Sequence, residues 1–233
     1  MDGDTWRVHI GCYLLSSGGR TLLVDTGVGP APDPFFGGLR GNLMDELKAN
    51  GVSPEDINTV FLSHLHPDHV GWNLTANRKP TFPNARYVMH KADWDAFQTP
   101  EVQQAFPFAF VDQTLTPLQA LDILDLLSGE HPLTEEVVAI PTPGHTPGHM
   151  SILISSGGEK ALILGDALVH PAQVSQPDWL FGFDMDAQGA AATRKELLDR
   201  VEAEGMTVVQ CHLPSPGFGH IIRLEGRRYW QAL

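Results

Sequence analysis

A short segment of the chain, Ser63-His64-Leu65-His66-Pro67-Asp68-His69, concentrates three histidines and one aspartate. Imidazole nitrogens and carboxylate oxygens are the ligands that a borderline metal ion such as Zn²⁺ prefers. In locally extended backbone, alternate side chains point the same way, so His64 and His66 can reach one ion. Asp68 and His69 follow a proline that bends the chain, so they can turn toward a second ion. The pattern therefore predicts metal chemistry here rather than a solvated polar loop.

Four further segments carry a polar side chain after an apolar run, at positions where loops carry function. A carboxylate at the end of a buried strand is costly unless a cation or hydrogen bonds compensate it. Each such residue taken alone is more often a hydrogen-bonded turn residue, but together with the histidine cluster they favour a metal site. The four segments carry Asp25, the pair His145 and His149 of a double Pro-Gly-His turn, Asp166, and His212.

In order along the chain, these motifs resemble those of the metallo-β-lactamase-fold hydrolases. The resemblance runs from the Val24–Gly27 segment through the HxHxDH cluster and the Pro-Gly-His turn to the late histidine. It implies a dinuclear zinc hydrolase with a metal-bridging hydroxide as the nucleophile, with Mn, Co or Fe as alternatives to Zn. It also implies that His64, His66 and His145 hold one metal, that Asp68, His69 and His212 hold the second, and that Asp166 bridges both.

The charge of this implied centre suits hydrolysis. Five neutral histidines and two aspartates contribute −2, two Zn²⁺ contribute +4 and a bridging hydroxide −1, which leaves +1 beside a developing oxyanion. Two metals can also bring the pKa of a bridging water to about neutral and polarise the substrate. The sequence has no Gly-x-Ser-x-Gly motif that would supply a serine nucleophile instead.

Residues around the implied ligands receive supporting roles. We expect Asp25 and His149 to hold ligands in place through hydrogen bonds rather than to bind metal. The candidate catalytic residues are Asp68, Asp166 and His170, of which His170 either donates to the substrate or merely caps a loop. Aromatic side chains near the motifs could form an apolar substrate pocket, although most of them could equally belong to the core. These aromatic residues are Phe35, Phe36, Trp72, Trp179, Phe181 and Phe218.

Three features of the sequence indicate which branch of the family the chain resembles. Asp166 stands where some true β-lactamases have a cysteine ligand, and residues 167–174 lack the tyrosine that quorum-quenching lactonases often carry. The segments Gly165–Val174, Phe183–Asp186 and Cys211–His220 resemble the methyl parathion hydrolase-like branch. This implies a neutral lactone, ester or organophosphate triester as substrate. The alternatives are a β-lactam hydrolase, a mononuclear iron dioxygenase for a sulfur substrate, and a non-catalytic metal-binding scaffold.

Composition limits the partners of the protein. The 233 residues include 15 basic and 28 acidic side chains, a net charge of −13. This charge argues against nucleic acid and anionic membrane surfaces and favours a small neutral substrate. No run of about 18 apolar residues and no apolar segment at the N-terminus occurs, so we expect a cytoplasmic protein without a signal peptide. The sequence does not say whether its two cysteines, Cys12 and Cys211, form a disulfide.

Apolar periodicity predicts an α+β fold, an αββα sandwich of two mixed sheets with helices on both outer faces. We expect a single domain over residues 1–233. Members of the branch that it resembles usually have further strands before the segment that matches Val24–Gly27, so either the first hairpin is missing here or the fold begins late. A missing hairpin would open a sheet edge or the pocket wall and favour a homodimer. Helices are expected at Asn42–Asn50, from Ala92 and at Gly189–Glu204, and a helix-loop insertion at Thr99–Pro132. Strands are expected at Val8–Leu15, Thr21–Asp25, Ile57–Leu62, Ala85–Met89, Glu136–Ile140, Met150–Ser155, Ala161–Gly165, Met206–Gln210 and Ile221–Leu224.

Overall fold

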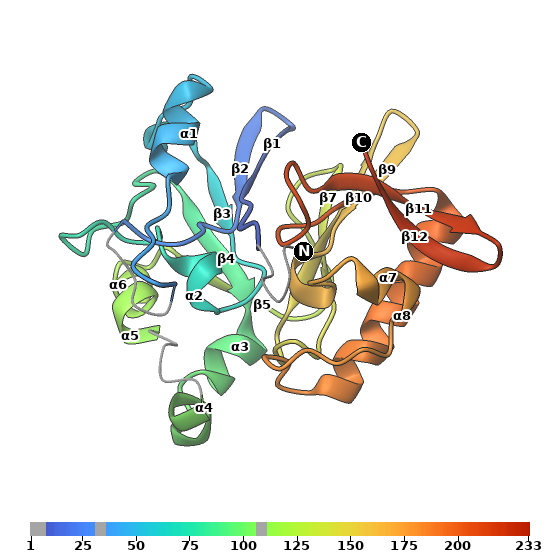
Figure 1. The fold of residues 1–233 in the computed structure, drawn as a ribbon. Helices are drawn as coiled ribbons and strands as arrows, with labels where there is room; N and C mark the ends of the chain where they lie inside the picture. Colours follow the sequence, from blue (N-terminus) through green and yellow to red (C-terminus); the bar gives the residue numbers. More distant parts are fainter. Residues whose placement is uncertain (1–7, 31–35, 106–110) are drawn as a thin grey trace. The chain divides into compact units, whose positions relative to one another are not determined.

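The structure is a computed structural model that describes residues 8–30, 36–105 and 111–233 (Figure 1). The chain forms two compact units. The N-terminal unit comprises Cys12–Glu135, and the C-terminal unit comprises Glu136–Leu233 together with Met1–Gly11. The expectation of one domain over the whole chain stays a prediction.

The N-terminal unit is built on a mixed sheet of five strands in the order β1-β2-β3-β4-β5. The β1–β2 hairpin is antiparallel and the other three pairings are parallel. Strand β3 lies in the middle and all three of its residues are buried, as expected for a central parallel strand. The strands are β1 (Tyr13–Ser17), β2 (Arg20–Val24), β3 (Thr59–Phe61), β4 (Arg86–His90) and β5 (Leu124–Leu127).

Short helices connect these strands. Helix α2 begins with Pro67, whose fixed φ and missing N–H suit the first position of a helix. A reciprocal pair of hydrogen bonds between Ser53 and Asp56 caps the 3-10 helix η1. The helices are α1 (Leu43–Ala49), η1 (Pro54–Asp56), α2 (Pro67–Val70), α3 (Lys91–Ala96), α4 (Pro100–Ala105), α5 (Val111–Thr114) and α6 (Thr116–Ala120), and the short β6 (His131–Pro132) follows them.

The C-terminal unit contains a second mixed sheet, in which its own strands follow the order β12-β11-β10-β9-β8-β7. Strands β9 and β10 are parallel neighbours, whereas the other pairings are antiparallel. The carboxyl ends of β9 and β10 therefore meet at one edge of the sheet. The strands are β7 (Val137–Pro141), β8 (Met150–Ser156), β9 (Glu159–Ile163), β10 (Thr207–Val209), β11 (Phe218–Leu224) and β12 (Arg227–Ala232).

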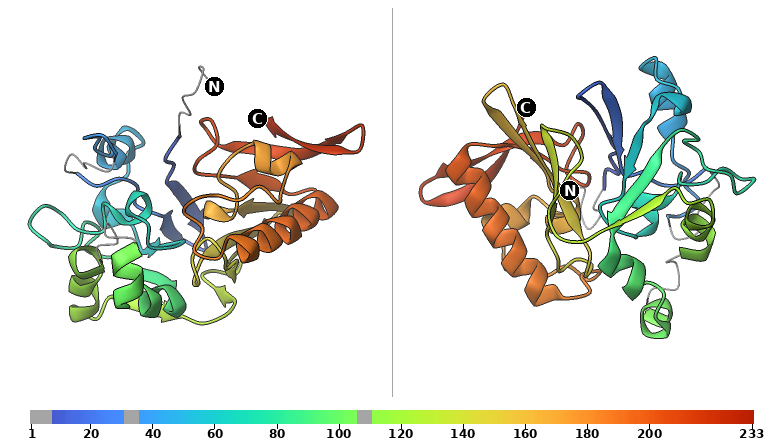
Figure 2. Two further views of the ribbon diagram at one scale, coloured as in Figure 1. Left: turned by 60° about the horizontal axis from the view of Figure 1, so that its bottom comes forward. Right: turned by 180° about the vertical axis from the view of Figure 1, so that it is seen from behind.

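The long helix α8 (Ala187–Glu204) covers this second sheet, and Figure 2 shows it running beside the strands. It begins where the side chain of Asp186 accepts the N–H of Gly189, and it ends at Gly205, whose φ of 62° is left-handed. Leu198 and Val201 pack with Leu162 of the sheet in one buried cluster. The other helices of this unit are η2 (Gly165–Ala167) and α7 (Ala172–Ser175).

Two mixed sheets with accompanying helices confirm the predicted α+β class. Three expected elements need correction. The strand expected at Val8–Leu15 starts only at Tyr13, and the one expected at Ala161–Gly165 ends at Ile163 because Gly165 adopts a positive φ of 55° in η2. The expected insertion Thr99–Pro132 contains β5, whose short apolar run was hidden among helical segments.

Strand β12 was not predicted, because its sequence Arg-Arg-Tyr-Trp-Gln-Ala is too polar to show the alternation of a half-buried strand. Within the parts of the chain that the structure describes, no helix combines the length and the apolar character needed to cross a bilayer.

Candidate metal centre

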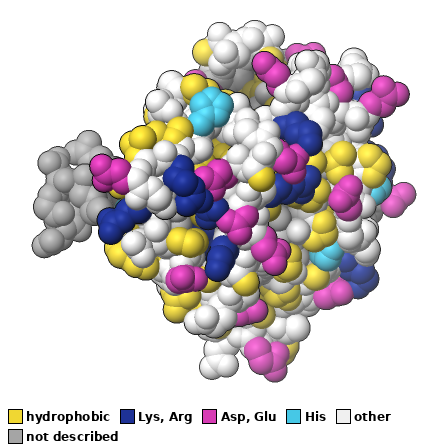
Figure 3. Space-filling view, turned by 90° about the vertical axis from the view of Figure 1, so that its right-hand side faces the viewer, with side chains coloured by type: hydrophobic (Ala, Val, Ile, Leu, Met, Phe, Trp, Pro, Cys, Tyr) yellow, Lys and Arg dark blue, Asp and Glu magenta, His cyan; other side chains and the backbone are white. Residues whose placement is uncertain are grey.

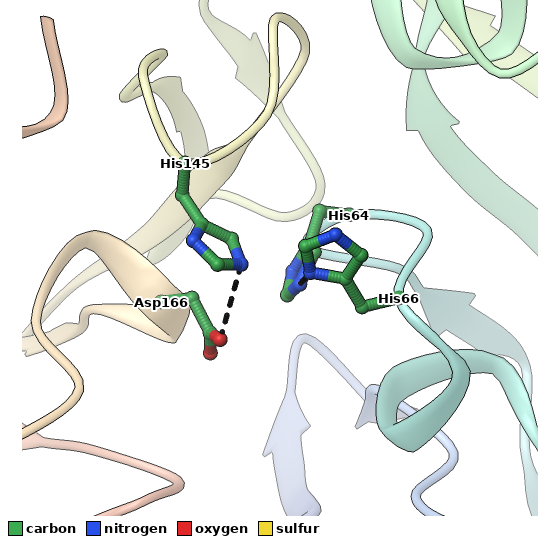
Figure 4. Close-up of side chains that lie close together, drawn as sticks. All are labelled: His64, His66, His145 and Asp166. Atoms are coloured by element: carbon green, nitrogen blue, oxygen red, sulfur yellow. Dashed lines mark hydrogen bonds and ion pairs between the residues drawn. The ribbon is translucent and has the colours of Figure 1, made fainter. Parts of the chain in front are cut away.

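The predicted ligands His64 and His66 lie on the loop that follows β3, and both are buried. His64 Nε2 is 3.1 Å from His66 Nδ1, and Figure 4 shows the two rings side by side on this loop. Two nitrogens bound to one tetrahedral zinc ion at 2.0–2.1 Å lie about 3.3 Å apart. The two histidines are therefore spaced as ligands of one ion.

Asp25 organises this loop from the end of β2. It is buried, and it adopts a left-handed φ of 59° that aspartate tolerates better than most residues. Its carboxylate accepts the backbone N–H of Ser63 at 2.7 Å, the Ser63 hydroxyl at 2.8 Å and His69 Nδ1–H at 2.8 Å. The bond to Nδ1 fixes the tautomer in which Nε2 of His69 presents its lone pair to a metal.

The remaining predicted ligand of this unit, Asp68, lies beside His69 on α2. Its Oδ2 is 3.7 Å from His69 Nε2. The loop is anchored from behind, because Thr26 donates its backbone N–H to the carbonyl of His69 at 2.7 Å. Gly71 lies so close to the neighbouring loop that a Cβ there would come within 2.2 Å of the Gly29 nitrogen, which requires glycine. Asp25, Ser63 and Thr26 thus hold this ligand segment rigidly.

In the C-terminal unit, the Asp166 carboxylate lies between two of the predicted histidine ligands. His145 Nε2 is 3.2 Å from Asp166 Oδ2 (Figure 4), and His212 Nε2 is 3.1 Å from Oδ1. Asp166 follows β9 and His212 follows β10, so the parallel pairing of these strands brings the two together. His212 Nε2 is also 3.2 Å from Oδ2, so both carboxylate oxygens face the histidines, and a carboxylate in this position has one oxygen available for each of two ions.

Each of these histidines is oriented through its other ring nitrogen. His145 Nδ1 donates to Asp184 Oδ1 at 2.8 Å, and His212 Nδ1 donates to the carbonyl of His9 at 2.9 Å. Both rings therefore present Nε2 on the side of Asp166, and carboxylate or carbonyl partners of this kind support metal-bound histidines.

His149 supports Asp166 instead of joining this set. Its Nε2 accepts the backbone N–H of Asp166 at 2.9 Å, and its Nδ1 donates to the hydroxyl of Thr142 at 2.8 Å. The ring thus links the Pro-Gly-His turn to the η2 turn and uses both nitrogens to do so. Both ring nitrogens of His149 are engaged in these bonds, and its supporting role at a metal centre stays a prediction.

The electrostatics of the set depend on the Asp166 carboxylate. Burial alone would lower the pKa of His212, but Asp166 and the adjacent Cys211 hold that pKa well above its usual value of 6.5. Without a metal, the positive charge of His212 therefore compensates the buried carboxylate. A divalent cation would satisfy the same carboxylate in place of that proton, so the donor set fits a metal ion.

The sequence did not reveal Asp184, Arg194 and Gln210. The Asp184 carboxylate is fully buried (0% exposed), and Arg194 Nη2 lies 3.6 Å from it. Gln210 is also buried, and its Oε1 accepts the backbone N–H of His212. Asp184 lies in an irregular loop and Arg194 on a helix face that otherwise reads as amphipathic, so no spacing indicated either. The only signal was the position of Gln210 at a strand end.

His170 and the aromatic residues predicted to bind substrate differ in their contacts and in their exposure. His170 Nδ1 accepts the backbone N–H of Ala172 at 3.0 Å and so caps α7, and burial lowers the pKa of this histidine. Phe181 stacks on His145 with ring centroids 6.1 Å apart, whereas Trp179 is 58% exposed. Phe218 is also exposed, and Phe36 and Trp72 of the N-terminal unit are half-buried; Phe35 lies outside the described residues.

Comparisons with known proteins show which family the chain belongs to. The sequence profile of the metallo-beta-lactamase superfamily matches residues 7–212. An N-acyl homoserine lactonase from a Bacillus species is 27% identical over 239 residues, which cover 96% of this chain and 85% of the relative. The N-acyl homoserine lactonase AttM of Agrobacterium fabrum is 29% identical over 233 residues, 91% of this chain and 85% of the relative.

Two solved structures are similar over 97% of this chain and 80% of their own. One is described as the hydrolase AbOPH of the beta-lactamase superfamily, with a TM-score of 0.85 and 28% identity. The other is AidC, a dizinc quorum-quenching lactonase in complex with a product, with a TM-score of 0.82 and 29% identity. The protein therefore belongs to the metallo-beta-lactamase superfamily and is one of its metal-dependent hydrolases.

Proposed function

We propose that this hydrolase is a dinuclear zinc lactonase that opens neutral lactones, with N-acyl homoserine lactones as the first class to test. The observation that carries the proposal is the buried Asp166 carboxylate, which lies between the Nε2 atoms of His145 and His212 as a bridging ligand would. The lactonase names of relatives that align along nearly the whole chain support the substrate class.

Seven side chains make up the proposed ligand set. Four of them lie in one short segment of the sequence, and three lie in separate segments. In our proposal one zinc ion is held by His64, His66 and His145, the second by Asp68, His69 and His212, and both by Asp166. Two such ions would supply a water of near-neutral pKa and polarise the lactone carbonyl.

The rest of the chemistry belongs to the protein. Asp25 and Asp184 would keep the imidazoles of His69 and His145 in the tautomer that binds metal, as their 2.8 Å hydrogen bonds indicate. Phe181, stacked on His145, would offer an apolar surface beside the reacting carbonyl. We also propose that His170 donates a hydrogen bond to the substrate. Its Nδ1 accepts a backbone N–H, so in the neutral ring the proton is on Nε2, the atom that would donate.

The net negative charge of the protein favours uncharged substrates over anionic ones. A net charge of −13 repels anions, and a phosphodiester would bring its own negative charge to the site. Neutral lactones, aryl esters and phosphotriesters avoid that repulsion. Lactones come first because the named relatives act on them, while esters and triesters share a neutral, polarisable centre.

The test is a parallel measurement of kcat/KM on an N-acyl homoserine lactone, a simple γ-lactone, an aryl ester, a phosphotriester, a chromogenic cephalosporin and a bis-aryl phosphodiester. We expect the lactones to exceed the cephalosporin and the phosphodiester by more than roughly tenfold, a difference of about 1.4 kcal/mol in transition-state binding. Chelator-treated protein and Asp166→Asn serve as inactive references. A cephalosporin or phosphodiester that beats every lactone, ester and triester would overturn the substrate assignment.

A further inference from the structure

Cys211 precedes the proposed ligand His212, and its thiol points at the same carboxylate. Its Sγ lies 3.4 Å from Asp166 Oδ1, the oxygen that is 3.1 Å from His212 Nε2. Cys211 is only 2% exposed. Three different ligand atoms of the C-terminal unit, from sulfur, nitrogen and oxygen, therefore converge after β9 and β10.

These separations suit a shared ion. A zinc ion binds sulfur at about 2.3 Å and carboxylate oxygen at about 2.1 Å, so two such ligands in tetrahedral geometry lie about 3.6 Å apart. The observed 3.4 Å between Sγ and Oδ1 is close to this value. The same oxygen and His212 Nε2 are also at a separation that two ligands of one ion can adopt.

The backbone that carries the thiol is fixed. Gln210 Oε1 accepts the N–H groups of His212 at 2.6 Å and Leu213 at 2.7 Å, and its Nε2 donates to the carbonyl of Gly165 at 2.8 Å. The carbonyl of Cys211 accepts the N–H of Gly11 at 3.0 Å. The turn with Cys211 and the turn with Asp166 are thus tied together, so the backbone that carries the thiol is held beside Asp166.

We propose that Cys211 is an additional, thiolate ligand of the metal held by Asp166 and His212. The inference rests on the proposed metal centre but not on the lactone substrate. On binding, the S–H bond breaks, its proton leaves to solvent and a sulfur–metal bond forms. The thiolate adds one negative charge to the centre and favours a borderline metal such as zinc over the harder manganese or magnesium.

Cobalt substitution tests this directly. Full-length protein is stripped with a chelator, reloaded with Co²⁺ and examined for the near-ultraviolet sulfur-to-cobalt charge-transfer band. We expect the band in the wild type, its loss in Cys211→Ser with the visible cobalt bands retained, and its full retention in Cys12→Ser, which changes the only other cysteine. Cobalt-loaded wild type without the band, or Cys211→Ser with it, overturns the proposal.

A measurement on the unmodified protein covers the case in which Cys211→Ser does not fold. X-ray absorption at the zinc edge should show a sulfur scatterer at about 2.3 Å, about one for every two zinc ions. A shell of nitrogen and oxygen alone would mean that the thiol only donates a hydrogen bond to Asp166, and would overturn the proposal. Sulfur ligation in a protein that opens no lactone would leave Cys211 as a ligand and remove only the substrate class.

Discussion

The two units supply metal ligands in different ways. In the N-terminal unit the proposed ligands come from one segment, His64 to His69, and a single carboxylate, Asp25, holds it through three hydrogen bonds. In the C-terminal unit they come from three segments, at His145, Asp166 and His212. Their arrangement depends on the β9–β10 pairing and on side chains outside the proposed ligand set, such as Gln210 and Arg194.

The two sets of ligands therefore differ in how far apart they lie in the sequence. A ligand segment that is continuous in sequence keeps its own ligands together and needs one external support, here Asp25 at the end of β2. Ligands that meet only through tertiary structure should be sensitive to any change that loosens the turns that carry them. Substitutions behind the C-terminal ligands should therefore cost more stability than matched substitutions behind the N-terminal segment.

The largest effect is expected from Asp166→Asn. This change removes the charge between His145 and His212, and it should lower kcat/KM on the best lactone by more than roughly a hundredfold and lower the bound metal. Glu159→Gln, at an exposed position of β9, the strand that precedes Asp166, is the matched control and should change neither quantity. Activity within tenfold of wild type in Asp166→Asn would remove the bridging role.

Gln210→Ala and Ser63→Ala compare how much each unit's hydrogen bonds behind its proposed ligands contribute to the free energy of unfolding. The first leaves buried backbone groups of His212, Leu213 and Gly165 without their partner and should lower the free energy of unfolding by about 3 kcal/mol. The second removes only the Ser63 hydroxyl and should lower it by about 1 kcal/mol, because the backbone N–H to Asp25 remains. Urea unfolding of the metal-free proteins measures both; equal losses would contradict the comparison.

Asp184→Asn and Asp25→Asn compare the carboxylates that orient one histidine in each unit. Each should weaken zinc binding by about 10–100-fold, because the imidazole loses its fixed tautomer. Asp184→Asn should also lower the melting temperature of the metal-free protein, since it removes the carboxylate beside the buried Arg194. Calorimetric zinc titration and thermal unfolding separate the two effects; a larger drop in Asp25→Asn would reverse our ranking.

The sequence predicted most of the metal-ligand candidates because their signals are local. Four of them lie within six residues, and Asp166 and His212 each follow an apolar run that forms a strand. Asp184 was beyond sequence reasoning, since it reaches His145 from 39 residues away out of an irregular loop. The charge of Arg194 predicts an exposed position on α8, yet the side chain is buried and donates to the carbonyl of Ala167 at 2.9 Å.

The fold shows the same limit. Apolar strands such as β3 and β8 were found near their true bounds, because burial leaves a clear pattern in the sequence. The strand β12 gives no such pattern, although it pairs with β11 and its Trp230 packs against the buried cluster. Figure 3 shows basic and acidic side chains intermixed on the face of the protein that β11, β12 and α8 share.

The smallest effect is expected from this surface. The guanidinium of Arg223, with that of Arg228, lowers the pKa of Glu202 to about 2 from its usual 4.5. The carboxylate therefore contributes stability above pH 4.5 and loses it as the pH falls toward 2. Glu202→Gln should cost about 0.5–1 kcal/mol at pH 7 and less as the pH falls below 4.5 in urea unfolding of the metal-free protein. A cost that grows with acidity would have the wrong sign.

The most direct test of the central claim is a zinc titration of chelator-stripped protein, followed by kcat/KM on an N-acyl homoserine lactone and by elemental analysis. We predict no lactone hydrolysis without metal and a rise that saturates at two zinc ions per chain. Metal should be lost again as the pH falls to about 6.5 and below, where imidazoles take up protons. Full hydrolysis in the presence of chelator, or a fully active protein with a single iron ion and no zinc, would contradict the account.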